Sequence, residues 1–424
     1  MLADPRSAQH KPPHLIEAAF LVLLLVASTG AFFRFGLATG VWGVLYLGTG
    51  ALILAHADAW LKTASQAWPL LLFPAFCLLS TLWSEDPSAT LRNALQYVCT
   101  VAMAVYVGAR FAPHQLIGYL CAAMAICIAV SVMGTSFAGV AGYQQQDYVG
   151  AERYFVGLYP QKNMMGLVIV MAVMSIIAVG LIYRQKALAF TAAALISVVV
   201  FEAKSTTALL LCVAALSTYG FWWLFTHSTR AVLGSLLGGA VACLAILLVL
   251  GSQLPVFESV LETVGKDHTL TGRTAIWEAG WSVGSAHPLL GVGYQAFWSA
   301  PSFAGDVLSI RAAVLDTIGG FHNAYLEAWV ATGLIGLALF CLIPLTGLAV
   351  AVRCLSGAHR DDAFAALALM IVITARSFTE STGHYQHDLE FILLVALATS
   401  LYQFVLKPEK TNQPHGEISL GAAR

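Results

Sequence analysis

The chain has 424 residues, of which 59% are hydrophobic and only 10% are charged, and its mean hydropathy is +0.78. A soluble globular protein carries roughly 25% charged residues, so the composition excludes a soluble domain and indicates an integral membrane protein. The formal net charge of -1 gives no support for nucleic-acid binding. The eight cysteines lie in apolar segments or, for Cys354, near an inner helix end, and we expect small core residues there, not outer disulfides.

Membrane helices account for most of the chain, because a helix needs about 20 apolar residues to cross the hydrocarbon. Twelve such runs start near residues 15, 36, 67, 91, 114, 163, 187, 205, 231, 322, 363 and 388. The third is short and contains Pro74, and only "FEAKST" separates the seventh from the eighth. The polar segment before the first run does not look like a cleavable signal peptide. The sequence therefore predicts an all-α integral membrane protein with about 12 transmembrane helices.

Lys and Arg residues in the loops predict that both termini are cytoplasmic. The short inner loops then hold Arg6, Lys11, Lys62, Arg110, Arg184, Lys186, Arg230, Arg353, Arg360, Lys407 and Lys410. Residues 1–252 would contain helices 1 to 9, residues 253–321 a large outer loop, residues 322–406 helices 10 to 12, and residues 407–424 a cytoplasmic tail. The stretch "TGRTAIWEAGWSVGSAHPLLGVG" predicts a helix within the large loop.

Four cations are expected at the starts of outward-opening helices: Lys162, Lys204, Arg273 and His322. A cation at a helix N-terminus costs about 0.3–1 kcal/mol unless an anion is bound there, because the macrodipole is positive at that end. Several such ends around one pocket would suit a phosphate or a pyrophosphate. The alternative for each residue alone is a side chain that reaches to the membrane interface.

His322 is the candidate general base, because a histidine is largely neutral at pH 7 and can accept a hydroxyl proton. Its neighbours on one helix face are Tyr325, Trp329, Gly333 and Gly336. The two glycines would let another helix pack closely, so that the ring points into the bundle at its wet boundary. Asn323 could orient a sugar hydroxyl or the ring. A capping or interfacial histidine is the alternative.

No outer Asp-x-Asp pair is available for Mg²⁺, so no metal or other cofactor is expected, and Lys and Arg would stabilise the leaving charge. The last outer segment, residues 375–391, adds Arg376 and Glu380, and the glutamate could pair with the arginine or with a lysine. His384 and His387 lack a third ligand at a convincing spacing for a metal. "SEDPSATLRNAL" predicts an N-cap for the fourth helix, with Arg92 a weaker candidate.

The pieces "LLSTLWSEDPSATLRNAL", "GLYPQKNMMG", "GRTAIWEAGWSVGSAHPLLGVGYQAF" and "HNAYLEAWVATGLIG", followed by an outer glutamate, resemble the O-antigen ligase and polymerase family of bacterial membrane glycosyltransferases. The resemblance implies a GT-C-like helical fold in the inner membrane and a metal-independent site facing the periplasm. It also implies a glycan donor on undecaprenyl diphosphate. The family's arginine and histidine fall on Arg273 and His322, and its Lys-Asn pair on Lys162 and Asn163. Relatives often have Ser, a basic residue and Thr, whereas here Ser205 follows Lys204.

The resemblance implies that His322 deprotonates the acceptor hydroxyl, which attacks C1 of the donor sugar with inversion. The diphosphate would leave against Arg273 and Lys162, with Lys204 and Arg376 as further candidates. Four aromatic residues could stack on sugars or belong to an interfacial belt: Trp277, Trp281, Tyr294 and Trp298. The acceptor would be another lipid-linked glycan in a polymerase, which "GLYPQKNMMG" favours, or lipid A-core in a ligase. A flippase for lipid-linked sugars is disfavoured, because the spans are almost free of mid-membrane charge.

Overall fold

The computed structural model describes residues 14–134, 142–145, 153–185, 273–314, 319–357, 359–381 and 383–406, with isolated residues between 189 and 222. Its first helices are α1 (Leu15–Ser28), α2 (Ala38–Ala55), α3 (Ala57–Gln66), α4 (Trp68–Leu79), α5 (Pro87–Arg110), α6 (Pro113–Gly134) and α7 (Lys162–Ile182). The later ones are α12 (Arg273–Ala286), α13 (Ala304–Val314), α14 (Ala324–Cys354), α15 (Arg360–Arg376) and α16 (Leu389–Leu401). Short turns lie at η2 (Phe33–Phe35), η3 (Ser80–Leu82), η5 (Pro301–Phe303) and η6 (Tyr402–Leu406).

Nine of the twelve predicted span starts lie in the described residues, and each is within four residues of an observed helix start. The starts near residues 187, 205 and 231 lie outside the described residues, as do most of the loop 253–272 and the tail 407–424. The helix predicted inside the large loop is α12. The apolar runs and the capping residues in the sequence therefore predicted the positions of these helices correctly.

Among the described residues, five helices are long and apolar enough to cross a membrane, and a sixth crossing results if α3 and α4, bent by 91°, form one span. α1 has 14 residues and α15 has 17, which is short for a full crossing. The chain is thus a multi-pass, mainly helical membrane protein, and the count of about twelve spans stays a prediction.

The outer segment 135–162 contains a feature that the all-α prediction omitted. Strands β1 (Gly142–Gln145) and β2 (Arg153–Gly157) pair in an antiparallel two-stranded sheet, with Tyr143 opposite Phe155. β2 then leads through a turn at Gly157, whose φ of +58° is in the left-handed region that glycine tolerates, toward the start of α7. The hairpin is too short and too polar to alter the hydropathy pattern, which explains why the search for apolar runs missed it.

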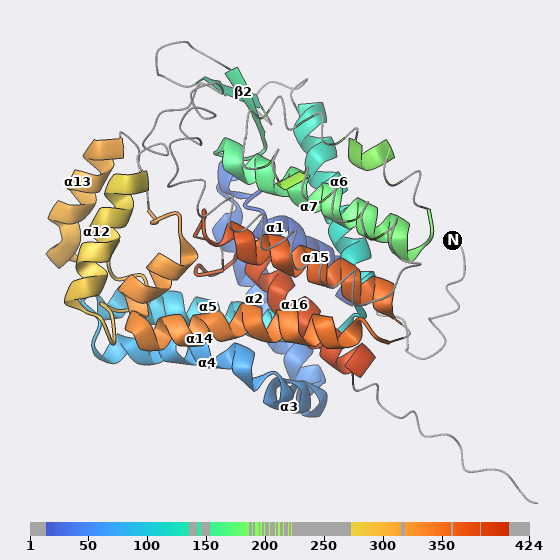
Figure 1. Ribbon diagram of the computed structural model, residues 1–424, viewed down its shortest axis with the longest axis horizontal. Helices are drawn as coiled ribbons and strands as arrows, with labels where there is room; N and C mark the ends of the chain where they lie inside the picture. The colour runs from blue at the N-terminus through green and yellow to red at the C-terminus, as the bar shows by residue number, and fades with distance from the viewer. Residues whose placement is uncertain are drawn as a thin grey trace, which may run out of the picture.

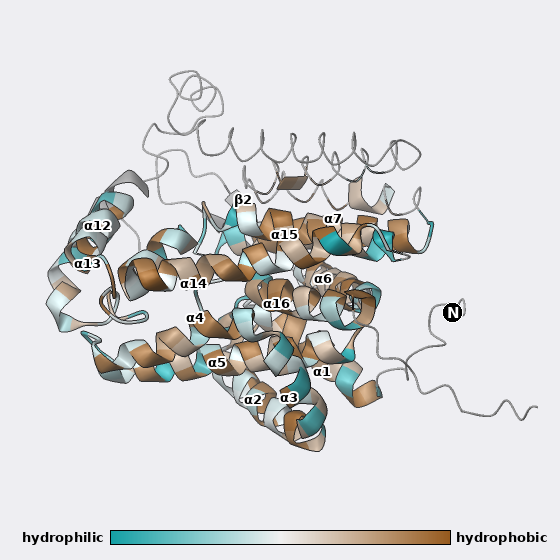
Figure 2. Ribbon diagram, turned by 60° about the horizontal axis from the view of Figure 1, so that its bottom comes forward, coloured by the Kyte–Doolittle hydropathy of each residue, from teal (hydrophilic) through white to brown (hydrophobic). Residues whose placement is uncertain are grey.

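Helices α5, α14, α15 and α16 lie alongside one another and form the centre of the bundle (Figure 1). α16 is buried along its whole length and packs against α5, while α7 packs against α6. α2 instead exposes Val44, Leu47 and Leu54. Figure 2 shows the apolar residues that cover the long helices. An exposed apolar helix of this kind is suited to contact with lipid chains.

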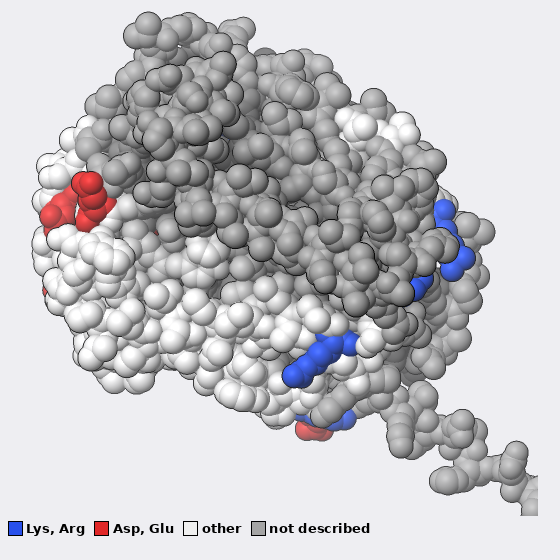
Figure 3. Space-filling view, in the orientation of Figure 1, with Lys and Arg blue, Asp and Glu red and all other residues white. Residues whose placement is uncertain are grey.

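The two ends of the bundle differ in charge. In Figure 1, α12 and α13 lie at the left-hand end of the bundle. On the face shown in Figure 3, the Lys and Arg side chains in view lie toward the right and the lower edge, where one acidic side chain also lies, and the other Asp and Glu side chains in view lie at the left near α12 and α13. Arg110, Arg353 and Arg360 lie at the ends of α5, α14 and α15. This asymmetry agrees with the predicted orientation of the loops.

α14 is broken at Gly333, where the backbone has φ 66° and ψ -171°. The segment after α12 fills the break with four backbone hydrogen bonds: Val292 N to Val330 O (3.0 Å), Gly293 N to Ala331 O (2.9 Å), Leu334 N to Pro288 O (2.8 Å) and Ile335 N to Leu289 O (3.4 Å). A Cβ on Gly333 would lie 2.1 Å from the Leu289 carbonyl carbon. Irregular backbone inside a membrane protein requires such internal partners.

The close approach predicted at the two glycines of α14 is confirmed, but a helix provides it at only one of them. At Gly333 the neighbour is the loop that carries "PLLGVG". At Gly336 a Cβ would lie 3.4 Å from the ring of Phe76 in α4. The loop and α14 therefore form one rigid unit beside the residues that precede α14.

Candidate functional site

Two loops meet at the start of α14: residues 319–323, which precede it, and residues 377–388, which connect α15 to α16. The N–H of Ala324 donates to the carbonyls of Ser377 (2.9 Å) and Glu380 (3.2 Å). Oδ1 of Asn323 accepts from the N–H groups of Tyr325 (3.0 Å) and Leu326 (3.1 Å). Asn323 is thus the N-cap of α14. The first N–H groups of this helix are occupied internally and leave no anion site there, contrary to the expectation for this helix end.

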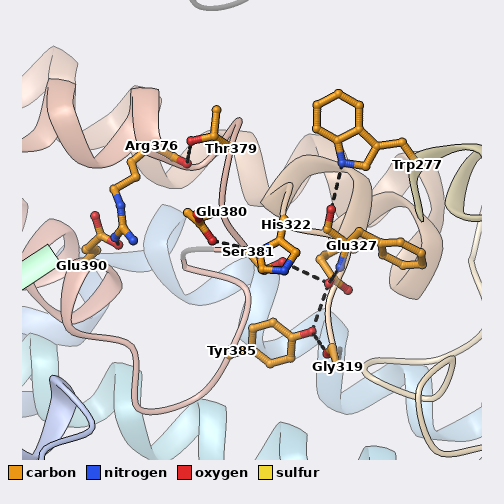
Figure 4. Close-up of polar contacts among 11 residues, drawn as sticks. Trp277, Gly319, His322, Glu327, Arg376, Thr379, Glu380, Ser381, Tyr385 and Glu390 are labelled. Carbon is orange, nitrogen blue, oxygen red and sulfur yellow. Dashed lines mark hydrogen bonds and ion pairs between the residues drawn. The ribbon is translucent and has the colours of Figure 1, made fainter. Parts of the chain in front are cut away.

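His322 is paired with Glu380. The Nδ1 atom of His322 lies 2.9 Å from Oε2 of Glu380, and the two side chains are 30% and 14% exposed (Figure 4). Nε2 of His322 has no hydrogen-bond partner among the residues that the structure describes. A carboxylate on Nδ1 favours the tautomer with the proton on Nδ1, so that Nε2 presents a lone pair. This arrangement suits a general base that faces a partly solvated space.

The backbone of His322 has a φ of +51°, in the left-handed region. A non-glycine residue held there costs about 1–3 kcal/mol and persists only where its surroundings fix it. Trp277 in α12 supplies one such contact, because its indole N–H donates to the carbonyl of Phe321 at 2.8 Å. The N–H of Phe321 donates to the carboxylate of Glu327 at 2.5 Å. Trp277 thus anchors the histidine loop, and its stacking on a sugar stays a prediction.

Arg376, the last residue of α15, is 9% exposed and forms an ion pair with Glu390 of α16. Its guanidinium points toward Glu390 and away from His322 (Figure 4). Glu380 and Asp388 add further attractive charge to it. Glu380 is thus close enough to attract Arg376, but it forms its hydrogen bond with His322. Binding of a diphosphate by Arg376 stays a prediction that would require this buried pair to open.

A second set of residues surrounds the start of α7. Lys162 and Asn163 are the first two residues of that helix, and Gln161 provides no side-chain cap. The preceding segment is fixed by Tyr159, whose hydroxyl donates to Thr29 at 3.2 Å. Lys162 therefore stands at a helix N-terminus, as predicted.

Arg34, between α1 and α2, is a cation that the motif search did not select. It donates from Nη1 to the carbonyl of Gly157 at 3.1 Å, five residues before Lys162. The rule that singled out basic residues in outer loops would have found it, because Arg34 lies between the first two spans.

The remaining predicted cations are only partly described. Arg273 is the first residue of α12, as expected for a helix N-terminus, but its side chain is outside the described residues. Lys204 also lies outside them. The convergence of Lys162, Lys204 and Arg273 on one pocket therefore stays a prediction.

The segment before α5 joins the same end of the molecule. Asp86 accepts from the N–H of Ala89 at 3.1 Å, which confirms the predicted N-cap, and from the hydroxyl of Ser299 at 2.8 Å. These hydrogen bonds, that of Ala89 first, hold the pKa of Asp86 below its usual value. Glu85 N also donates to Val292 O at 3.0 Å. The residues that cap α5 thus also contact the segment between α12 and η5, part of which fills the break in α14.

The other aromatic residues have mixed positions. Tyr294 is fully buried and donates its hydroxyl to the carbonyl of His384 at 2.6 Å, which leaves no open ring face for a sugar. The indole N–H of Trp298 donates to Glu327 at 3.3 Å. Trp281 is 66% exposed and packs edge to face with Trp329. Of these residues, Trp281 keeps an accessible surface for stacking.

His384 and His387, in the loop between α15 and α16, lie in different environments. His384 is fully buried, its ring nitrogens have no hydrogen-bond partner among the described residues, and burial lowers its pKa to about 3. His387 stacks on Trp42 with ring centroids 3.8 Å apart and contacts the hydroxyl of Tyr46. Burial lowers the pKa of His387 to about 4. The two rings are thus neutral packing residues near pH 7 and do not share a ligand.

Two comparisons with known proteins found similar sequences. The O-antigen ligase family matches residues 191–341, a segment that includes Arg273, His322 and Asn323. The exopolysaccharide production protein ExoQ of Rhizobium meliloti (strain 1021) is 28% identical over 352 residues, which cover 77% of this chain and 78% of that protein. Both matches confirm the resemblance to the O-antigen ligase and polymerase family that the motifs indicated.

Proposed function

We propose that this protein transfers a glycan from undecaprenyl diphosphate to a sugar hydroxyl at the periplasmic face of the bacterial inner membrane. It does so without a metal ion and acts chiefly as a polymerase of O-antigen or exopolysaccharide repeat units. The observation that carries the proposal is the His322–Glu380 pair, with Nδ1 held at 2.9 Å and Nε2 presented to a partly open space. The family resemblance supplies the class of substrate.

The reaction follows from the tautomer. Nε2 of His322 takes the proton from the acceptor hydroxyl as its oxygen forms a bond to C1 of the donor sugar. The bond from C1 to the phosphate oxygen breaks, and the configuration at C1 inverts. Lys162 and Arg273, with Lys204, stabilise the negative charge of the departing diphosphate. Glu380 stabilises the imidazolium that His322 becomes.

A small apolar pocket lies beside the loops. It lies between α14, α15 and α16 and is lined mainly by Tyr325, Phe340, Pro344, Ile373, Thr374 and Phe391, with Ser377 at the loop end. Ser377 O accepts from the first N–H of α14, so the pocket adjoins the His322 loop. The pocket volume of about 10 Å³ holds at most one water molecule, so we expect the prenyl chain of the donor in another groove.

The orientation rests on charge. Arg110, Arg353 and Arg360 lie at helix ends, and His322 precedes the start of α14, whose far end carries Arg353. By the positive-inside rule, this distribution supports a periplasmic position for His322.

A reconstituted assay tests the chemistry. The purified protein in lipid nanodiscs receives lipid-linked repeat units alone, and then with lipid A-core. Glycan ladders without the core indicate a polymerase, whereas transfer only to the core indicates the ligase that the family description favours. Movement of the substrate across a bilayer without any new glycosidic bond would identify a flippase.

His322→Ala should abolish most transfer, and His287→Ala, at an exposed histidine on the same side of the molecule, is the matched control. General-base catalysis contributes about 10²- to 10⁴-fold, so the loss should lie in that range. An undiminished rate in the His322 variant would refute the assignment.

A further inference from the structure

A second carboxylate, Glu327, lies beneath the His322–Glu380 pair. It belongs to the first turn of α14 and is only 3% exposed. Its four donors are Phe321 N (2.5 Å), Tyr385 Oη (3.0 Å) and Ser381 Oγ (3.1 Å) at Oε1, and Trp298 Nε1 (3.3 Å) at Oε2. Figure 4 shows several of these groups around the carboxylate. Three separate segments of the chain therefore meet on one buried side chain.

The contacts of Oε1 join the two loops that carry the pair. Phe321 immediately precedes His322, and Ser381 immediately follows Glu380. Each partner of the pair is thus one residue from a group that is bound to the same oxygen. Tyr385 adds a third tie, because its hydroxyl also lies 2.7 Å from the carbonyl of Gly319.

The packing around this carboxylate leaves no spare room. A Cβ on Gly320 would lie 3.0 Å from Oε1 of Glu327, 3.0 Å from the hydroxyl of Tyr385 and 3.1 Å from Oγ of Ser381. A Cβ on the adjacent Gly319 would meet nothing within 4 Å. A methyl group at position 320 therefore presses on the cluster, and one at position 319 does not.

Neither helix capping nor substrate contact accounts for Glu327. Asn323 already caps α14 through two hydrogen bonds. Glu327 is buried beneath the loops, so it does not reach an acceptor directly. Its oxygens accept hydrogen bonds from the segments whose relative position sets the 2.9 Å contact between His322 and Glu380.

We propose that Glu327 is the positioning residue of the glycan transfer, because its carboxylate holds the His322 loop and the Glu380 loop at the distance that the proton transfer requires. The inference rests on the proposed function and adds to it a residue outside the reacting pair. Because Glu327 acts by positioning Glu380, the effect of replacing Glu327 should largely disappear once Glu380 is replaced. A merely structural role would not show this dependence.

A double-mutant cycle in nanodiscs tests this dependence. Glu327→Gln should lower kcat at least about 10-fold and leave the donor KM within about 2-fold, because orientation changes the reacting state and not donor binding. In a Glu380→Gln background the same substitution should cost less than about 2-fold, since residues that act through one contact are not additive.

The glycine pair gives a second, milder perturbation. Gly320→Ala should reduce kcat in the same way as Glu327→Gln, again with little effect in the Glu380→Gln background. Gly319→Ala should keep the kcat of the unchanged protein. Thermal unfolding in the nanodisc is measured for every variant, and if Glu327→Gln does not fold, the two glycine variants in both backgrounds decide the question.

The outcomes separate the inference from the proposed function. Full activity in Glu327→Gln, or losses that add in the double variant, would overturn the positioning role while His322 remains essential. Full activity in His322→Ala would instead refute the proposed base, whatever Glu327 does.

Discussion

The substitution Glu380→Gln tests how the carboxylate acts on His322. It keeps the size of the side chain but removes the charge next to Nδ1. The amide can also turn its NH₂ group toward the ring, which favours the tautomer with the proton on Nε2. A ring in that tautomer cannot accept the acceptor proton, so transfer should slow while binding of the lipid-linked donor stays unchanged.

The size of the effect follows from the contact. A hydrogen bond to a charged group contributes about 1.5–3 kcal/mol. At about 1.4 kcal/mol per tenfold change in rate, this corresponds to roughly a 10- to 150-fold loss of kcat. The His322 side chain is 30% exposed, so solvent screens part of the interaction. We therefore expect a loss of about 10- to 30-fold, toward the lower end of that range.

The measurement is single-turnover transfer from a fluorescent lipid-linked repeat unit, with saturating acceptor and donor. Glu380→Gln, His322→Ala and the double variant are compared with the unchanged protein. The double variant should be no slower than His322→Ala, because without the imidazole the carboxylate has nothing to orient. A normal single-turnover rate for Glu380→Gln, or a further loss in the double variant, would refute the role of the pair.

Three other predictions concern the surroundings. Gly333→Ala should destabilise the protein by about 2–5 kcal/mol, since the left-handed backbone and the carbonyl of Leu289 leave no room for a Cβ; thermal unfolding checks this. Thr374→Trp should overpack the small pocket between α14, α15 and α16 and destabilise the protein by about 1–3 kcal/mol, which thermal unfolding also measures. Burial holds the pKa of His384 near 3, below its unfolded value of about 6.5, so the unfolded state binds its proton first and stability falls as pH drops below about 6.5. His384→Phe should remove about 2 kcal/mol of the loss between pH 7 and 5. The comparison with the unchanged protein isolates this effect from that of Asp388, because burial raises the pKa of Asp388 and its protonation acts in the opposite direction.

The helices were predictable because their signals are local. Apolar runs bounded by polar loops placed nine starts, and the N-cap at Asp86 follows from an acidic residue next to Pro87. The position of His322 before an Asn-capped helix is also a local property. By contrast, the break at Gly333 depends on a loop some forty residues earlier in the chain, and only the packed structure shows which backbone groups fill it.

The partners in the site were harder to predict, because they are distant in sequence. His322 and Glu380 are 58 residues apart, and the sequence left Glu380 with Arg376 or a lysine. Glu327 was overlooked, although a carboxylate at the start of an apolar run carries a usable signal. A charged group in a membrane helix is energetically unfavourable unless it has partners. The reason for selecting the cations as candidate site residues therefore applies to Glu327 as well.

The charges of the described residues also divide the site into two parts. Glu327, Glu380 and Glu390 lie on the side formed by α14, α15 and α16, where Glu390 neutralises Arg376. A diphosphate there would be repelled by these carboxylates, and the N–H groups of α14 are already occupied. In an inverting displacement the attacking oxygen and the leaving group lie on opposite sides of C1. For the proposed transfer we therefore expect the acceptor beside His322 and the diphosphate near the cations that begin α7 and α12.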